Sequence, residues 1–171
     1  TYSPEYWEDE EFKARRYTLL GTLYREDPVP EPAGKYDIPA VRPKGWAIAG
    51  FEIDGMKLNL KVGRWETDGV KEIWELLPEK GLQIEWNYPY AGNDVYLVME
   101  GAVHVKADGH DFTARKRDVI NIPPYYKHTL TVLEEGTVIY AYNVQSCLMH
   151  VMERLKAEKI RTPENLKDWG Y

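Results

Sequence analysis

Proton transfer near neutral pH depends on imidazole, carboxylate and phenol groups, and imidazole is scarce in this chain. The four histidines are His104, His110, His128 and His150. An imidazole with its ordinary pKa near 6.5 is the natural general acid or base in this pH range. Tyrosine is abundant, with 13 copies beside 6 tryptophans and only 3 phenylalanines. Tyr and Trp join an apolar body to a polar tip, so this composition indicates half-wet pockets more than a dry core.

Three aromatic residues that precede the first acidic candidate have the spacing of one strand face. Side chains alternate along a strand, so Trp86, Tyr88 and Tyr90 share a face if the strand from Leu82 to Tyr88 continues through Pro89. A phenol on such a face can donate a hydrogen bond to a carbonyl or phenolate oxygen.

The same alternation groups two further pairs. Tyr96 lies two residues after Asp94 and shares its face, and Tyr140 shares a face with Tyr142. We expect both pairs to reach the interior of the fold. Cys147 is expected to pack as an apolar side chain.

Short antiparallel strands must position these residues. Val95 to Met99 is an apolar run of strand length that ends at a glycine. Asp108-Gly109 predicts a two-residue hairpin turn of type I′, because glycine adopts positive φ without steric cost. Pro123-Pro124 ends a later strand, because proline has no N–H to donate to a β-ladder.

Further strands are expected around this meander, and helices are expected only at the two ends. The additional strand candidates span 46–53, 56–64, 71–77, 118–122, 129–133 and 137–143. Ser3-Pro4-Glu5 has the pattern of a helix start. Gln145 to Lys159 has apolar residues at helical spacing. The sequence therefore predicts an all-β fold, a small sandwich or jelly-roll barrel with N- and C-terminal helices.

The 171 residues fit one domain with three segments. We expect an N-terminal helix and proline-rich arm at 1–43, a barrel at 44–143, and a C-terminal helix and tail at 144–171. The stretch from Asp27 to Pro43 contains five prolines, which favour an extended chain. Such an arm suits the surface of a neighbouring subunit, so a homodimer is predicted.

Charge and composition exclude several partner classes. The net charge of −6 argues against a nucleic-acid-binding surface, which needs clustered basic residues. No apolar stretch is long enough to span a membrane. The single cysteine cannot form an internal disulfide and fits a reducing compartment, so a cytoplasmic protein is expected.

Two stretches resemble the signature motifs of the cupin superfamily. They read V-Y-L-V-M-E-G, ending at Gly101, and R-D-V-I-N-I-P-P-Y-Y-K-H, ending at His128. Between them lies the Asp-Gly hairpin. The chain departs from the second motif at three positions: Arg117 replaces the usual Gly before the Asp, Tyr125 replaces the Gly of Pro-x-Gly, and Val132 replaces the usual Asn.

The resemblance implies a jelly-roll barrel with one interior site. It places Tyr88 and Tyr90 where the family has two histidines, Asp94 where it has a glutamate, and His128 on the second-motif histidine. A typical cupin site of three histidines and a glutamate suits Fe, Mn, Ni or Zn. Here one histidine, one aspartate and two neutral phenols replace it. We therefore expect no metal and no other cofactor.

The expected site is an aromatic cavity that binds a small molecule. His128, Tyr88, Tyr90 and Asp94 are the candidate catalytic residues. The candidate substrate-binding residues are Trp86, Tyr96, Tyr126, Tyr140 and Tyr142. The leading hypothesis is a lyase or isomerase that uses metal-independent acid–base chemistry on an aromatic or cyclic oxygenated molecule. The alternatives are a metal-dependent dioxygenase or hydrolase with an irregular ligand set, and a binding protein without turnover.

Overall fold

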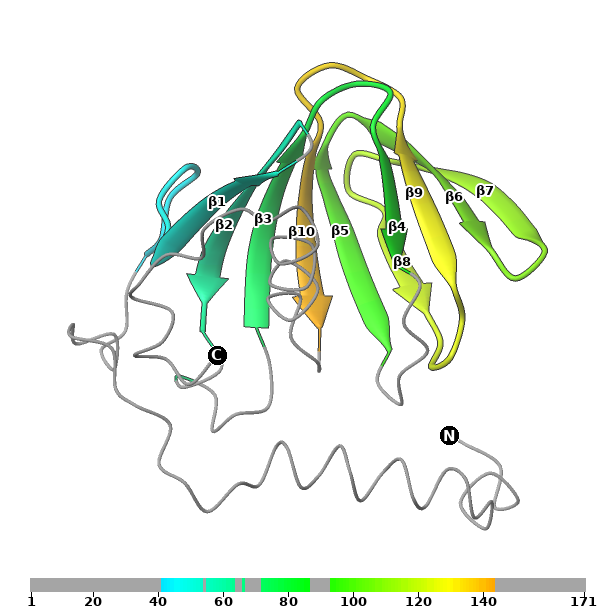
Figure 1. Cartoon of the computed structure of the whole chain (residues 1–171), viewed down its shortest axis with the longest axis horizontal. Coiled ribbons are helices and arrows are strands. Elements are labelled where there is room, and N and C mark those ends of the chain that lie inside the picture. Colours follow the sequence, from blue (N-terminus) through cyan, green and yellow to red (C-terminus); the bar gives the residue numbers. More distant parts are fainter. Residues whose placement is uncertain (1–40, 54, 64–65, 67–71, 87–92, 144–171) are drawn as a thin grey trace, which may run out of the picture.

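The described part of the chain consists of β-strands joined by turns (Figure 1). The structure, a computed structural model, describes residues 41–53, 55–63, 66, 72–86 and 93–143. Its strands are β1 (Ala49–Ile53), β2 (Met56–Val62), β3 (Glu72–Pro78), β4 (Gln83–Trp86), β5 (Asp94–Glu100), β6 (Ala102–Ala107), β7 (His110–Arg115), β8 (Val119–Ile122), β9 (His128–Val132) and β10 (Val138–Asn143). The two predicted terminal helices and most of the proline-rich arm lie outside the described residues.

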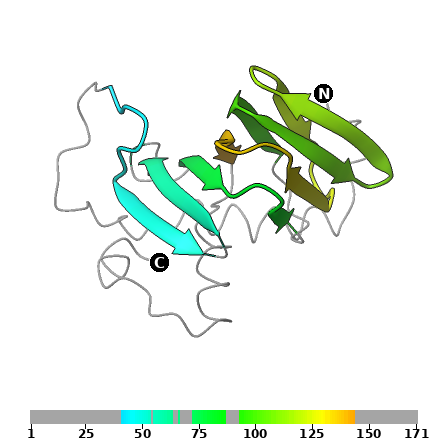
Figure 2. The same cartoon turned by 90° about the horizontal axis from the view of Figure 1, so that it is seen from above.

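The strands form two antiparallel sheets that enclose one core (Figure 2). The first sheet has the order β1-β2-β3-β10-β5-β8 and the second β4-β9-β6-β7. Buried side chains of both sheets, among them Leu58, Trp74 and Leu130, belong to one hydrophobic cluster. This is a jelly-roll arrangement, which confirms the predicted all-β barrel.

Alternation decides which side chains fill the core. On β2, Met56, Leu58 and Leu60 are buried, whereas Lys57 between them is exposed. On β5, Asp94, Tyr96 and Val98 are buried and alternate with partly exposed residues.

No helix among the described residues is long and apolar enough to cross a membrane.

The turns follow the sequence signals closely. Asp108 and Gly109 both have positive φ, 42° and 80°, as a type I′ hairpin requires. Arg117 and Tyr125 also have positive φ, 75° and 68°. These are the two positions at which the cupin pattern has glycine, so the backbone keeps the left-handed conformation that glycine favours although the residues differ.

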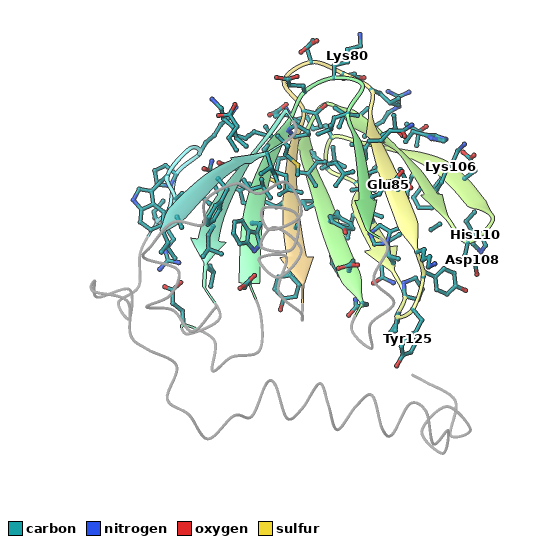
Figure 3. The ribbon with its side chains drawn as sticks, viewed as in Figure 1. Lys80, Glu85, Lys106, Asp108, His110 and Tyr125 are labelled. Carbon is teal, nitrogen blue, oxygen red and sulfur yellow. The ribbon has the colours of Figure 1, made fainter. Side chains whose placement is uncertain are left out.

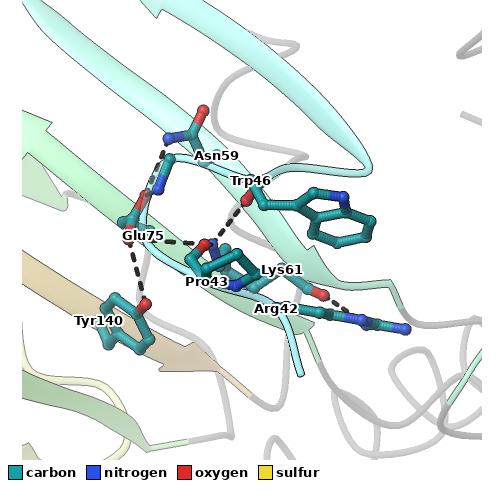
Figure 4. A network of polar contacts seen from close by, with 8 residues as sticks. Arg42, Pro43, Trp46, Asn59, Lys61, Glu75 and Tyr140 are labelled. Carbon is teal, nitrogen blue, oxygen red and sulfur yellow. Dashed lines mark hydrogen bonds and ion pairs between the residues drawn. The ribbon is translucent and has the colours of Figure 1, made fainter. Parts of the chain in front are cut away.

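A network of polar side chains covers part of the outer face of the six-stranded sheet (Figure 4). The Lys61 ammonium donates to the carbonyl oxygens of Pro43 and Trp46, each at 2.6 Å. It also lies 3.9 Å from a carboxylate oxygen of Glu75. The network thus fixes the segment that precedes β1 against the sheet.

Glu75 is the acceptor at the centre of this network. Its carboxylate accepts hydrogen bonds from the Gly45 N–H and the Asn59 amide, both at 3.0 Å, and from the Tyr140 hydroxyl at 3.1 Å. Burial raises the pKa of Glu75. The hydrogen bonds and the charge of Lys61 outweigh burial, so the pKa lies below its ordinary value.

Candidate functional site

Two strands that begin at the lower end of the barrel in Figure 1 each start with a buried ionisable residue. Here β5 begins with Asp94 and β9 begins with His128. Asp94 is 4% exposed, Tyr96 0% and His128 3%. A buried polar group is costly unless it is hydrogen-bonded, so these three side chains need one another.

Tyr96 and His128 contact each other directly across the two sheets. The Tyr96 hydroxyl lies 2.7 Å from Nε2 of His128. On the other side of the ring, Nδ1 lies 3.2 Å from the Tyr126 carbonyl oxygen. A carbonyl only accepts, so Nδ1 carries the proton in the neutral imidazole, and Nε2 accepts from the tyrosine hydroxyl.

Asp94 is the third member of this buried polar group. Its Oδ2 atom lies 3.7 Å from Nε2 of His128. Burial raises the pKa of Asp94 from 3.8 to about 7, because the low-polarity interior disfavours the charged form. A carboxyl that titrates near neutral pH beside an imidazole can accept or deliver a proton.

Glu72 and Trp74 on β3 extend the polar end of the interior. Both are buried, and the Trp74 indole N–H donates to a Glu72 carboxylate oxygen at 2.8 Å. Asn143 of β10 pairs with Glu72 on one side and with Asp94 on the other, so the two acids lie at the same level of the sheet. Sequence reasoning missed Glu72. The available signal was an acid two residues before Trp74, on the apolar face of a predicted strand.

The predicted substrate-binding residues do not all meet here. Tyr96 is part of the site, and Tyr126 is partly buried against the core and contacts His128 through its carbonyl. Tyr140 and Tyr142 share a face, but it is the outer face. They alternate with Ala141, which is buried inside and pairs with Tyr96.

The expectation that Tyr140 and Tyr142 reach the barrel interior is therefore wrong. The tyrosine hydroxyl of Tyr140 donates to Glu75 in the outer network instead. The reason is the register of β10 with β5, which turns Ile139 and Ala141 inward.

The remaining predicted residues lie at the edge of the described chain. Trp86 is the last described residue of β4, and its backbone pairs with His128. Tyr88 and Tyr90 lie outside the described residues. Of the predicted catalytic residues, the described part of the chain contains Asp94 and His128, and Tyr96, which was predicted to bind substrate, contacts His128.

A cavity of about 260 Å³ opens beside the β6–β7 hairpin and has His128 in its wall. Lys106, Asp108 and His110 of this hairpin line the cavity, and Figure 3 shows Asp108 beside His110 near the hairpin tip. Lys127 and Thr129 flank His128 in the same wall.

The described donor set does not fit a typical cupin metal site. Within the described strands and turns, no three His, Cys, Asp or Glu side chains are grouped closely enough to hold a metal ion. The motif resemblance assigns Asp94 and His128 to two of the cupin ligand positions. It assigns the other two to Tyr88 and Tyr90, which lie outside this part of the chain.

Comparisons with known proteins agree with this architecture. No protein-family model matches the sequence, and no curated protein matches it. Among solved structures, KdgF from Halomonas sp. superposes with a TM-score of 0.50 at 12% identity, over 59% of this chain and 92% of that one. An RmlC-like cupin from Shewanella frigidimarina gives 0.49 at 18% identity, over 59% and 87%. A predicted oxalate decarboxylase from Thermotoga maritima gives 0.47 at 9% identity, over 52% and 77%.

The chain therefore has the cupin fold, as the two motifs predicted. At these identities the likeness concerns the fold alone. One fold hosts many unrelated functions, so activity has to be argued from the site.

Proposed function

We propose that this protein is a small-molecule enzyme of lyase or isomerase type that moves a proton by acid–base chemistry inside the barrel. The observation that carries the proposal is the buried Asp94–His128 pair, with Tyr96 bonded to the imidazole. Structural ion pairs also perturb pKa values. A carboxyl group with a pKa near 7 nevertheless can take up or release a proton at neutral pH, which is what a general acid or base has to do.

Asp94 is the member of the pair that holds a proton up to about neutral pH, because burial raises its pKa to about 7. As a carboxylic acid 3.7 Å from Nε2 of His128 it can deliver this proton, and as a carboxylate it can accept one. A substrate proton taken by one member is stabilised by the other, and the same pair returns it to a different atom of the substrate.

Tyr96 and the Tyr126 carbonyl hold the ring for this task. Tyr96 donates to Nε2 and the carbonyl accepts from Nδ1–H, which fixes the tautomer and the plane of His128.

We propose that Tyr88 and Tyr90 donate a hydrogen bond to the substrate oxygen on which charge develops. Trp86 and Tyr126 are the proposed aromatic contacts for the substrate. A cyclic or aromatic oxygenated molecule suits such a lining.

Solvent-deuterium incorporation tests the proposal before the substrate is known. The protein is incubated in D₂O with a set of cyclic ketones, phenols and cyclic hydroxy ketones, and mass spectrometry detects exchanged C–H positions. We expect exchange in at least one compound. Asp94→Asn and His128→Asn should each slow it about 10²-fold or more, the usual contribution of a general acid or base.

The outer His104–Asp111 pair supplies a matched control. These side chains are in contact on the exposed face of β6 and β7, so His104→Asn and Asp111→Asn change the same chemical groups far from the interior. Their exchange rates should equal that of the wild type. Exchange that survives both interior substitutions unchanged contradicts the proposal.

The same assay separates the other readings. Loss of activity with a chelator and recovery with Fe or Zn favours a metal-dependent dioxygenase or hydrolase. Binding of a compound without any exchange favours a non-catalytic binding protein. The mutual hydrogen bonding of Tyr96 and His128 would then serve the stability of the interior alone.

A further inference from the structure

The buried Asp94–His128 pair needs a route by which protons pass between it and solvent. Both side chains are buried, so bulk water reaches little of either one. An acid or base that has transferred a proton to or from a substrate returns to its starting form by exchanging protons with water. Deuterium from D₂O has to reach a substrate through the same exchange. The route to solvent is therefore a part of the site in its own right.

A second histidine lies in the same row of the sheet as His128. Ala107 of β6 is paired with His128 of β9 on one side and with His110 of β7 on the other. Directly opposite residues of antiparallel strands project from the same face of the sheet. Ala107 belongs to the buried core and His128 is buried beside it, so His110 also projects from the inner face. Two strand spacings separate the backbones of the two histidines by roughly 10 Å, and the side chain between them is a methyl group.

His110 differs from His128 in its access to solvent. It is the first residue of β7, an edge strand among the described strands, and its side chain is exposed. Figure 3 shows it near the tip of the β6–β7 hairpin. Phe112, two residues further along the same face, is 41% exposed, so the inner face of β7 is open at this end. The row thus leads from a buried imidazole to an exposed one.

The cavity beside the β6–β7 hairpin has both histidines in its wall. Its volume is about 260 Å³, and Ala107 lies in the wall with His110 and His128. A cavity holds ordered water when it is polar and roomier than a single water molecule. This one is large enough for several, and the other polar side chains of its wall are those of Lys106, Asp108, Asp111, Lys127 and Thr129. Water in the cavity can therefore bridge the two imidazoles.

We propose that His110 relays protons between the Asp94–His128 pair and solvent through water in this cavity. The proposal rests on the proposed function, because it takes this pair as the group that exchanges protons with a substrate. It adds a residue that acts through His128 and does not touch the substrate.

The relay moves one proton at a time. His128, once it has become imidazolium by taking a proton, gives an N–H proton to a water molecule, which passes one of its own protons to a ring nitrogen of His110. His110 then releases a proton to bulk water and is neutral again. The reverse sequence loads the pair. Imidazole suits this task because it has two ring nitrogens and ordinarily titrates near neutral pH.

Exchange at the His128 ring measures the relay without any substrate. In protein labelled with ¹⁵N at the imidazole nitrogens, NMR follows the exchange of the His128 ring N–H with water. We expect His110→Ala to slow this exchange about tenfold or more, since an acid–base group placed for proton transfer commonly contributes at least that factor. Added imidazole should restore the rate in this variant, because it replaces the missing side chain, and should change the wild-type rate little. His110 is exposed, so the variant is expected to keep the fold.

His104 supplies the matched control. It lies on the outer face of the same hairpin, where it contacts Asp111. His104→Ala removes an imidazole without touching the inner row, so exchange at His128 should stay at the wild-type rate. Ala107→Val tests the cavity itself, because it adds bulk between the two histidines and removes no titratable group. It should slow the exchange, and imidazole should not restore it.

Three results would overturn the relay. They are wild-type exchange in His110→Ala, a slowed rate in this variant that imidazole does not restore, or an equal loss in His104→Ala. Failure of the proposed function looks different. If no compound takes up deuterium while His110→Ala still slows exchange at His128, the route exists without the catalysis. Deuterium uptake by a substrate at equal rates in the wild type and in His110→Ala keeps the catalysis and removes the relay.

Discussion

Asp94 is a buried carboxyl group at the start of β5. Its pKa is raised from 3.8 to about 7 by burial, so the folded state holds this proton over a pH range in which the unfolded chain has lost it. Stability contributed in this way is present below the unfolded pKa. It is lost as the pH rises toward the folded pKa of about 7, above which it changes no further.

We predict that Asp94→Asn is more stable than the wild type at about pH 8 and close to it at about pH 4. The difference at the higher pH is at most about 4 kcal/mol, since each pKa unit corresponds to about 1.4 kcal/mol. Urea unfolding at both pH values measures it. A variant that is less stable than the wild type at the higher pH would show that partners stabilise the Asp94 anion.

Arg117 is a non-glycine residue in a turn that requires positive φ. It is exposed, it has a φ of 75°, and its N–H donates to the Val98 carbonyl at 2.7 Å. A side chain in this left-handed conformation costs about 1–2 kcal/mol. Glycine avoids that cost but adds entropy to the unfolded chain, worth about 0.5–1 kcal/mol.

Arg117→Gly should therefore stabilise the protein by about 0.5–1 kcal/mol. Thermal and urea unfolding measure the change. The neighbouring Lys116→Gly is the control: Lys116 has no positive φ to relieve, so this substitution should destabilise or be neutral. If both glycine variants lose stability equally, the turn at residue 117 is not strained.

The network around Glu75 is the device that fixes the segment before β1 to the sheet. The pKa of Glu75 is held below 4.5 because three hydrogen bonds and Lys61 outweigh the effect of burial. The stability it contributes is present above the unfolded pKa. That stability disappears as the pH falls through the folded pKa.

We expect Lys61→Met to destabilise the protein by about 3–5 kcal/mol at neutral pH, because the buried Glu75 carboxylate then lacks its cation. The loss should shrink on acidification below about pH 4.5 as Glu75 takes up a proton. Urea unfolding and hydrogen exchange at the Gly45 amide follow the two effects. Lys57→Met is the control, because Lys57 pairs with Glu52 on an exposed surface and should matter little.

At the scale of the whole molecule, both described sheets end in edge strands. β1 and β8 end one sheet and β4 and β7 end the other among the described strands. Val119 on β8 is 65% exposed and Phe112 on β7 is 41% exposed. Exposed strand edges and apolar side chains favour association with another chain.

A homodimer remains the prediction for the assembled protein. Sedimentation velocity at micromolar concentration should give about twice the chain mass of 19.9 kDa. Removal of residues 1–40 tests whether the proline-rich arm takes part, and should shift the equilibrium toward the monomer. A full chain that sediments as a monomer contradicts the prediction.

The local features of this barrel follow from the sequence. Asp108-Gly109 predicts its hairpin because local backbone sterics alone decide such a turn. Pro123-Pro124 likewise marks the end of a strand through a missing donor. The resemblance to the cupin motifs predicts that Asp94 and His128 face one interior, and in the structure Oδ2 of Asp94 lies 3.7 Å from Nε2 of His128.

The tertiary structure decides which groups meet. The alternation of side chains gives each strand two faces but does not say which face is buried. The register of β10 in the sheet decides this, and Tyr140 therefore points outward and donates to Glu75. The bond between Tyr96 and His128 joins two sheets, and Glu72 comes level with Asp94 only because β10 inserts between β3 and β5. These contacts depend on long-range pairing and register, which no local pattern of residues specifies.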